Sequence, residues 1–196
     1  MKSRKSGPRR VILASGSEER RKLLKKSGIS FVVRKSGYRE NLRLKLLPRK
    51  LAKHLALEKA RRVAARTKNA IVIGTDTFVV IDGEVIGKPR NPAHARKILE
   101  KLSGRKHIII TGYAFIDSDT GRATSRAVAT SVWFRTLDAR EIGRYVRSGE
   151  GLGAAGAYRI QKGAAKFVTR IRGDKDNVIG LPARLVQDLR QFRRRR

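Results

Sequence analysis

The chain has 196 residues, and 40% of them are hydrophobic, which is enough for one compact domain with a sizeable core. It contains no cysteine, so disulfides and thiolate metal sites are excluded, and its apolar runs are too short for a membrane-spanning helix. Lys and Arg number 48 against 16 Asp and Glu, a net charge of +32 that attracts polyanions such as nucleotides and nucleic acid.

The first segment predicts a strand, a small turn and a helix. The expected elements are a basic arm at residues 1–9, a buried strand at 10–14 and a helix at 18–27. Ser17 is a good N-cap, and Glu18 and Glu19 follow in the first helical turn, where acids suit the helix dipole. Free N–H groups converge at such a turn and can cradle an anion, with Arg20 and Arg21 beside it as phosphate ligands. Many turns of this kind bind nothing, so the cradle alone does not establish a site.

The second segment predicts a strand at residues 29–33, a polar loop that contains Glu40, and a long helix that Pro48 begins. The apolar positions of this helix recur at helical spacing: Leu51, Leu55, Ala56, Ala60, Val63 and Ala64. Lys59 lies near that apolar face. For a lone lysine on a basic helix, the pattern itself favours a solvated side chain.

Residues 70–89 read AIVIGTDTFVVIDGEVIGKP, around which the chain is organised. They predict a buried strand, a bend at Gly74 and Thr75 that carries Asp76, a second strand, and a hairpin at residues 82–83. A carboxylate between apolar runs is costly to bury unless it is paired, hydrogen-bonded or bound to metal. From this stretch alone, Asp76 is equally consistent with a turn-capping acid and with a catalytic or metal-binding one.

The rest of the chain alternates strands and helices, which indicates an α/β fold with a long hairpin inserted. The expected elements are helices at 92–102, 138–148 and 183–192, strands at 107–116, 123–134, 157–161 and 166–171, and a basic tail at 193–196. Trp133, the only tryptophan, is expected in the core. The three histidines lie in unrelated segments, which makes a zinc site improbable on spacing.

Eight segments, in order along nearly the whole chain, resemble the Maf family of nucleotide pyrophosphatases. They are LASGSEERRKLL at 13–24, LALEKA at 55–60, IGTDTFVV at 73–80, GKP at 87–89, LSGRKH at 102–107, TG at 111–112, AGAYRIQ at 155–161 and VIGLP at 178–182. Each segment is weak alone, and the set is specific. The resemblance implies one elongated, two-lobed α/β domain at residues 10–192, with a mixed sheet and a central cleft, similar to inosine triphosphate pyrophosphatases.

The family resemblance also implies an activity: hydrolysis of a nucleoside triphosphate to the monophosphate and pyrophosphate, with Mg²⁺ or Mn²⁺ as cofactor. It implies a cytoplasmic homodimer with no membrane attachment. Residues 155–161 resemble the branch acting on dTTP and UTP more than the branch acting on 7-methyl-GTP. Modified pyrimidine nucleotides are therefore expected substrates as well, which would give the protein a house-cleaning role.

Carried over residue by residue, the resemblance assigns a role to seven positions. Asp76 matches the catalytic acid, as general base or metal ligand, and Glu40 is a second, loosely aligned metal ligand. The substrate-binding positions are Ser15 and Arg20 as phosphate contacts, Lys59 and Lys88 as cleft lysines, and Gln161 near the base pocket. These types suit the chemistry, because attack on an α-phosphate needs an activated water and cations that absorb charge on the leaving pyrophosphate.

The chain departs from the family pattern at two places. Glu18 and Glu19 replace the Pro and one Arg of the usual Ser-Pro-Arg-Arg motif, so one phosphate contact is absent or Arg21 supplies it. Gly153 and Ala154 stand where the family often carries Asp-Lys. With the high charge, these departures leave an alternative open: a noncatalytic nucleic-acid-binding protein on the same fold. Nonspecific nucleic-acid binding at low salt is expected in either case, since it needs only charge.

Overall fold

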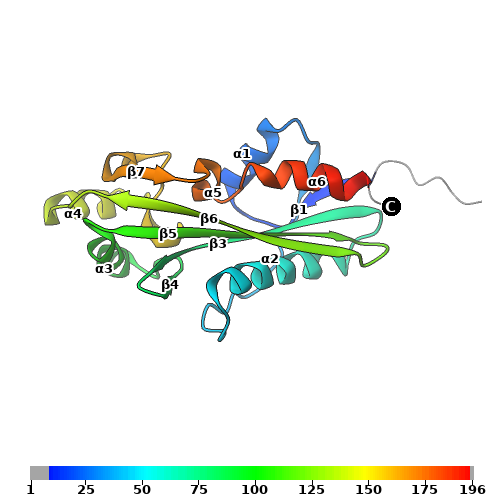
Figure 1. The fold of residues 1–196 in the computed structure, drawn as a ribbon, viewed down its shortest axis with the longest axis horizontal. Helices are drawn as coiled ribbons and strands as arrows, with labels where there is room; N and C mark the ends of the chain where they lie inside the picture. The colour runs from blue at the N-terminus through cyan, green and yellow to red at the C-terminus, as the bar shows by residue number, and fades with distance from the viewer. Residues whose placement is uncertain (1–8, 195–196) are drawn as a thin grey trace, which may run out of the picture.

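The computed structural model describes residues 9–194, which form an α/β fold around one seven-stranded mixed sheet (Figure 1). The strands are β1 (Arg10–Leu13), β2 (Phe31–Val33), β3 (Ala70–Ile81), β4 (Glu84–Ile86), β5 (Lys106–Asp117), β6 (Ala123–Phe134) and β7 (Val168–Arg172). Their order is β2-β1-β3-β5-β6-β7, and β4 pairs with β3. β1 is parallel to β2 and β3, and the other pairs are antiparallel. The predicted fold class is confirmed.

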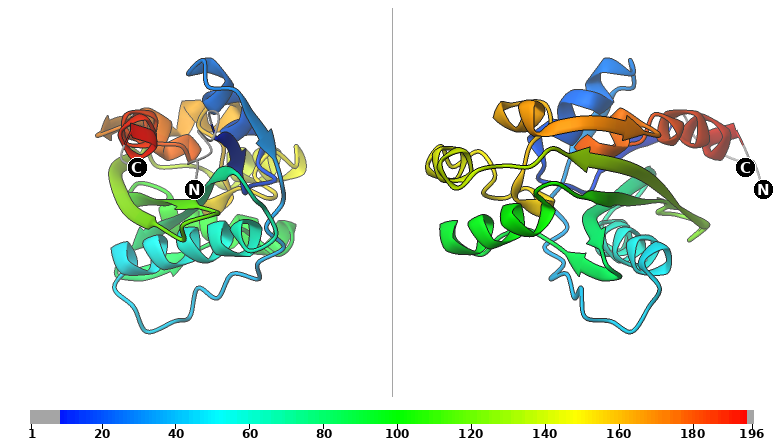
Figure 2. Two further views of the ribbon diagram at one scale, coloured as in Figure 1. Left: turned by 90° about the vertical axis from the view of Figure 1, so that its right-hand side faces the viewer. Right: turned by 60° about the vertical axis from the view of Figure 1, so that its left-hand side comes forward.

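Helices cover both faces of the sheet (Figures 1 and 2). They are α1 (Glu18–Lys26), α2 (Pro48–Ala64), α3 (Pro92–Leu102), α4 (Ala139–Arg147), α5 (Lys175–Ile179) and α6 (Arg184–Arg194), with 3-10 helices η1 (Ala155–Ala157) and η2 (Gly163–Phe167). α2 packs on one face, against β3, β5 and β6, while α1, α5 and α6 lie over the other (Figure 1). The helix predicted from Pro48 is confirmed, and so is the Ser17 N-cap, whose side chain accepts a hydrogen bond from the Arg20 amide.

The hydrophobic core is divided between the two ends of the long strands. One cluster joins α3 and α4 to η2 and includes Leu99, Tyr145 and Phe167. At the β1 end, separate clusters lie under α6 and under α2, with Leu189 and Val63 among their members. Because β3, β5 and β6 run through both ends, the molecule is elongated and its two halves share one sheet (Figure 1).

The predicted bend before Asp76 is wrong, because β3 is one continuous strand from Ala70 to Ile81. Gly74 serves helix packing instead of a turn. A Cβ at Gly74 would lie 2.0 Å from the carbonyl oxygen of Ala56 in α2, and one at Gly112 in β5 would lie 2.0 Å from that of Ala52. Asp76 stands opposite Gly112 in the β3–β5 ladder. The two glycines therefore let the backbone of α2 approach the sheet beside Asp76.

Two further expectations differ from the structure. The strand predicted at residues 157–161 is absent from the described fold, where η1 and turns replace it and Ala157 has a φ of 60°. Trp133 is half-buried rather than in the core, with Lys106 Nζ 5.3 Å and Arg170 Cζ 5.1 Å from its ring centroid.

The chain ends fall largely outside the described part. Of the basic arm expected at residues 1–9, only Arg9 is described. Of the tail expected at 193–196, the first two arginines continue helix α6, and residues 195–196 lie outside the described range.

Candidate active site

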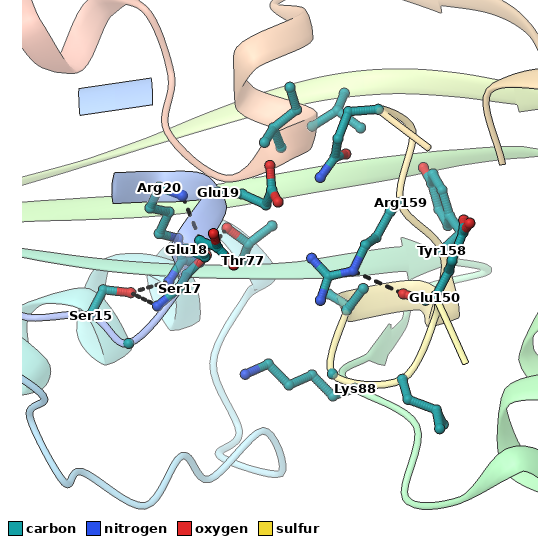
Figure 3. A pocket seen from close by; sticks show the side chains of 18 of the residues that line it. Ser15, Ser17, Glu18, Glu19, Arg20, Thr77, Lys88, Glu150, Tyr158 and Arg159 are labelled. Carbon is teal, nitrogen blue, oxygen red and sulfur yellow. Dashed lines mark hydrogen bonds between the residues drawn. The ribbon is translucent and has the colours of Figure 1, made fainter. Parts of the chain in front are cut away.

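A cleft of about 880 Å³ opens beside the sheet, between segments from both halves of the molecule. It is lined by residues 14–20 at the start of α1, residues 35–38 and 40 of the loop after β2, one side chain each from α2, β3 and β5, Lys88 after β4, residues 148–150, 152–155 and 158–162, and residues 178–179. Small-molecule sites occupy about 300–1,000 Å³, so a nucleotide-sized ligand is accommodated. Figure 3 shows its wall at α1 facing the wall that carries Tyr158 and Arg159.

Arg20 holds together the α1 wall of the cleft. Its guanidinium donates to the Gly180 carbonyl (3.0 Å), the Ser15 hydroxyl (3.2 Å), the Thr75 carbonyl (3.3 Å) and the Thr77 hydroxyl (2.8 Å). A guanidinium has five N–H donors, so these bonds leave about one for a ligand. Burial lowers the pKa of Arg20 from its usual value, although the side chain stays charged. Arg20 and Ser15 thus meet where the sequence predicted, with Arg20 mainly a scaffold.

The centre of the site is a buried ion cluster of Glu40, Lys59 and Asp76. The Lys59 ammonium donates to one oxygen of Asp76, and it lies 2.5 Å from Oε1 of Glu40. Lys59 is only 7% exposed and Asp76 only 2%. The expectation of a solvated Lys59, drawn from the helix pattern, is therefore wrong. Its placement beside the cleft agrees with the family resemblance.

Burial and charge act in opposite directions on the two carboxylates. Burial raises the pKa of Asp76 above its usual value, and the attraction of Lys59 offsets this only in part. Burial also acts to raise the pKa of Glu40, but the attraction of Lys59, Lys88 and Arg20 together outweighs it and leaves that pKa lowered. Asp76 does not line the cleft itself and lies behind Lys59, and its Oδ2 is buried without a hydrogen-bond partner. The cluster thus contains one carboxylate that holds a proton more readily than usual.

The other predicted residues lie on the far side of the cleft. Lys88 is exposed and extends from its loop into the cleft, toward the α1 wall (Figure 3). Gln161 lines the cleft and is exposed, on the segment that follows η1. Arg159 stands on the same segment, fixed by a bond from its Nε to the Glu150 carbonyl (2.8 Å), and was missed by the sequence analysis. The AGAYRIQ motif that contains Arg159 was the available signal.

Behind the wall that carries Arg159, Tyr158 pairs with the buried side chain of His107. The sequence did not predict this pair. The Tyr158 hydroxyl lies 2.9 Å from Nε2 of His107, and both rings pack edge-on against Phe134. Burial lowers the pKa of His107 to about 4 and raises that of Tyr158, so both are neutral at pH 7. A histidine followed by an apolar strand gave no indication of this pairing.

The two acids that depart from the family pattern both line the cleft. Glu18 is largely exposed and lies 3.5 Å from the Lys22 ammonium, while Glu19 is 17% exposed and lies 3.8 Å from it. Arg21 is not among the cleft-lining residues, and its guanidinium lies 3.9 Å from Glu18. The structure therefore does not support Arg21 as a replacement phosphate contact.

The carboxylates fit a hard divalent cation. Glu40 and Asp76 both carry carboxylate oxygens of the kind that bind such a cation, and both converge on the Lys59 ammonium. Oδ2 of Asp76 has no hydrogen-bond partner. Within residues 9–194 no group of three or more His, Cys, Asp or Glu side chains could hold a metal. A cation here would complete its shell with water and ligand phosphates, as Mg²⁺ commonly does.

No helix of the described range is long and apolar enough to cross a membrane.

Comparison with known proteins places the chain in a family. A family model described as "Maf-like protein" matches residues 10–192. The chain is 45% identical over 183 residues to a protein of Symbiobacterium thermophilum, 93% of each chain, and 44% identical over 184 residues to one of Geobacter sulfurreducens, 93% of this chain and 96% of the relative. It is 41% identical over 175 residues to one of Methanosarcina barkeri, 89% of each chain. All three relatives are named "dTTP/UTP pyrophosphatase". The chain thus belongs to the Maf-like protein family.

Proposed function

We propose that this protein is a nucleoside triphosphate pyrophosphatase that hydrolyses dTTP, UTP and modified pyrimidine triphosphates to the monophosphate and pyrophosphate. The names of relatives that are 41–45% identical over most of the chain support this activity. They favour an enzyme over a noncatalytic nucleic-acid-binding protein. The observation that carries the proposal is the Glu40–Lys59–Asp76 cluster beside a cleft of nucleotide size.

In the proposed reaction, water attacks the α-phosphorus, a new P–O bond forms, and the bond to the β-phosphate oxygen breaks. Asp76 takes the proton of the water, and pyrophosphate leaves with the electron pair of the broken bond. Burial raises the pKa of Asp76 and so acts to bring its proton affinity closer to that required of a general base, whereas a cation bound to it would act in the opposite direction. Because Asp76 lies behind Lys59, the lysine must shift toward the substrate phosphates for this step.

Cationic groups on both walls of the cleft hold the phosphates. Lys88 is exposed and faces the α1 wall, so its ammonium is free to move toward a phosphate in the cleft (Figure 3). Residues 17–20 at the start of α1 line the same cleft, and the first turn of a helix offers N–H groups to phosphate. Arg20 orients this wall through its four bonds to protein and keeps about one N–H for the substrate.

We include a divalent cation, Mg²⁺ or Mn²⁺, in this proposal, with Glu40 and Asp76 as its protein ligands. Bound there, it would supply charge stabilisation for the phosphoryl oxygens and lower the pKa of the attacking water. The two carboxylates converge on the Lys59 ammonium, whose place the cation would take once Lys59 shifts toward the phosphates. Gln161 is proposed as a contact to the base, since it is an exposed amide that lines the cleft.

The test is a substrate panel with measurement of pyrophosphate. The purified protein is incubated with dTTP, UTP, dCTP, ATP and GTP, each with Mg²⁺, with Mn²⁺, and with a chelator. We expect pyrophosphate from dTTP and UTP with either metal and none with the chelator. If no triphosphate gives pyrophosphate, the proposed activity is wrong. If release is equal with the chelator, the proposed metal requirement is wrong. Sedimentation velocity tests the proposed homodimer, and fractionation of the source cell tests the proposed cytoplasmic location.

A further inference from the structure

Helices α3 and α4 lie at the end of the molecule remote from the C-terminus (Figure 1), and a second concave site lies between them. It is a groove of about 410 Å³, which we call the α3–α4 groove. Its lining consists of Ala139 and Gly143 together with four arginines, Arg96, Arg140, Arg144 and Arg147. No acidic residue lines it. The groove therefore gathers four positive charges around one hollow.

Glycine at position 143 brings two of these guanidinium groups together. An added Cβ there would lie 3.1 Å from Nη2 of Arg96 and 3.4 Å from Nη1 of Arg147. Like charges that approach the same point repel one another, and the repulsion is relieved by an anion between them. A side chain at 143 would press on the guanidinium of Arg96 and touch that of Arg147, so both groups lie over the same small residue.

Protein carboxylates do little to neutralise the groove. Arg96 has one acidic neighbour, Glu100, at 3.9 Å, and it donates to the Ala139 carbonyl at 3.5 Å. In the described part of the chain, Arg140, Arg144 and Arg147 have no ion pair and no side-chain hydrogen bond with any residue. Their N–H donors are free to bind a ligand.

We propose that the α3–α4 groove is a binding site for an inorganic oligophosphate, an anion of two or more linked phosphates. Guanidinium groups bind phosphate oxygens in pairs of parallel hydrogen bonds, and four of them match an anion of charge about −4. Nucleic acid shares the phosphate chemistry but spreads its charge along an extended backbone. The convergence of the arginines around one hollow favours the compact anion. The site is separate from the Glu40–Lys59–Asp76 cleft, because the two share no lining residue.

The test follows the groove directly by NMR of the ¹⁵N-labelled protein in 150 mM NaCl, with tripolyphosphate as the titrant. The amide of Gly143 reports on the groove. We expect its resonance to shift with saturation in the wild type. In Arg140→Gln/Arg144→Gln, the dissociation constant measured from this resonance rises about tenfold or more, because two charge-assisted contacts are removed. The matched control, Arg190→Gln/Arg193→Gln, removes the same charge from exposed positions on α6. We expect its dissociation constant to stay within about twofold of the wild-type value.

Three results would overturn the proposal. The first is a Gly143 resonance that does not move while the amides at residues 15–17 of the cleft do. The second is an equal loss of binding in the groove and control variants, which would mean that only net charge matters. The third is binding of duplex DNA at the groove with none of tripolyphosphate. Both variants change exposed side chains, and their amide spectra report directly whether they are folded.

Discussion

Replacing Lys59 by methionine tests the buried ion cluster without altering its carboxylates. The ammonium of Lys59 is the shared partner of Asp76, which is 2% exposed, and of Glu40, whose side chain is 33% exposed. Removing one partner of a buried pair costs about 3–5 kcal/mol. Because Glu40 can turn toward water, we expect the lower end, about 3 kcal/mol of unfolding free energy at pH 7.

The size of this loss depends on pH. Burial raises the pKa of Asp76, and removing Lys59 raises it further, so the carboxyl of the variant protonates as the pH falls. A protonated Asp76 needs no cation, and the cost of Lys59→Met becomes smaller at pH 5 than at pH 7. Lys59→Met/Asp76→Asn should recover most of the lost stability at pH 7, since it removes both charges of the pair.

Urea unfolding at pH 7 and pH 5, followed by circular dichroism, measures these differences for the wild type, both single variants and the double variant. The reasoning is refuted if Lys59→Met loses less than about 1 kcal/mol at pH 7, the value typical of an exposed pair. It is also refuted if the double variant loses the sum of the two single losses, because the residues would then be independent.

Three further predictions concern other parts of the structure. Gly74→Ala puts a Cβ 2.0 Å from the Ala56 carbonyl and should cost about 3 kcal/mol in urea unfolding; an unchanged midpoint would contradict the close approach of α2. His107, with a pKa lowered from 6.5 to about 4 by burial, binds no proton in the folded state between these values while the unfolded chain does. The unfolding free energy present above pH 6.5 should therefore fall by up to about 3 kcal/mol as the pH approaches 4, and His107→Gln should lose this pH dependence. Parallel curves of unfolding free energy against pH for the two proteins would contradict this role of His107. Lys88→Ala removes an exposed cleft ammonium and should lower kcat/KM about tenfold or more with an unchanged melting temperature. A loss of activity that is accompanied by a matching loss of thermal stability would argue against a phosphate contact.

The sequence predicted the fold class and most elements, because those elements carry strong local signals. Pro48 and the apolar spacing after it mark α2, and Ser17 marks the start of α1. The bend expected at Gly74 was wrong since a glycine in a strand can serve either a turn or a close helix contact. Only the position of α2, which local sequence does not determine, distinguishes the two.

The candidate site was predictable in part. Position 59 shares the helical spacing of Leu55, Ala56 and Val63, so the period itself places Lys59 on the buried face, but the prediction gave more weight to the basic composition of the helix. The partnership of His107 with Tyr158 could not be predicted, because it joins residues 51 positions apart. The α3–α4 groove likewise depends on the packing of α3 against α4.

The initial rate of pyrophosphate release from dTTP and Mg²⁺, compared between the wild type and Asp76→Asn, tests the central claim most directly. Asp82→Asn is the matched control, because it makes the same chemical change at an exposed residue of the hairpin after β3. We expect Asp76→Asn to lose a factor of about 10²–10⁴, the range for a general base, while Asp82→Asn keeps the wild-type rate. An Asp76→Asn variant that stays folded and retains a rate close to that of the wild type would contradict the account.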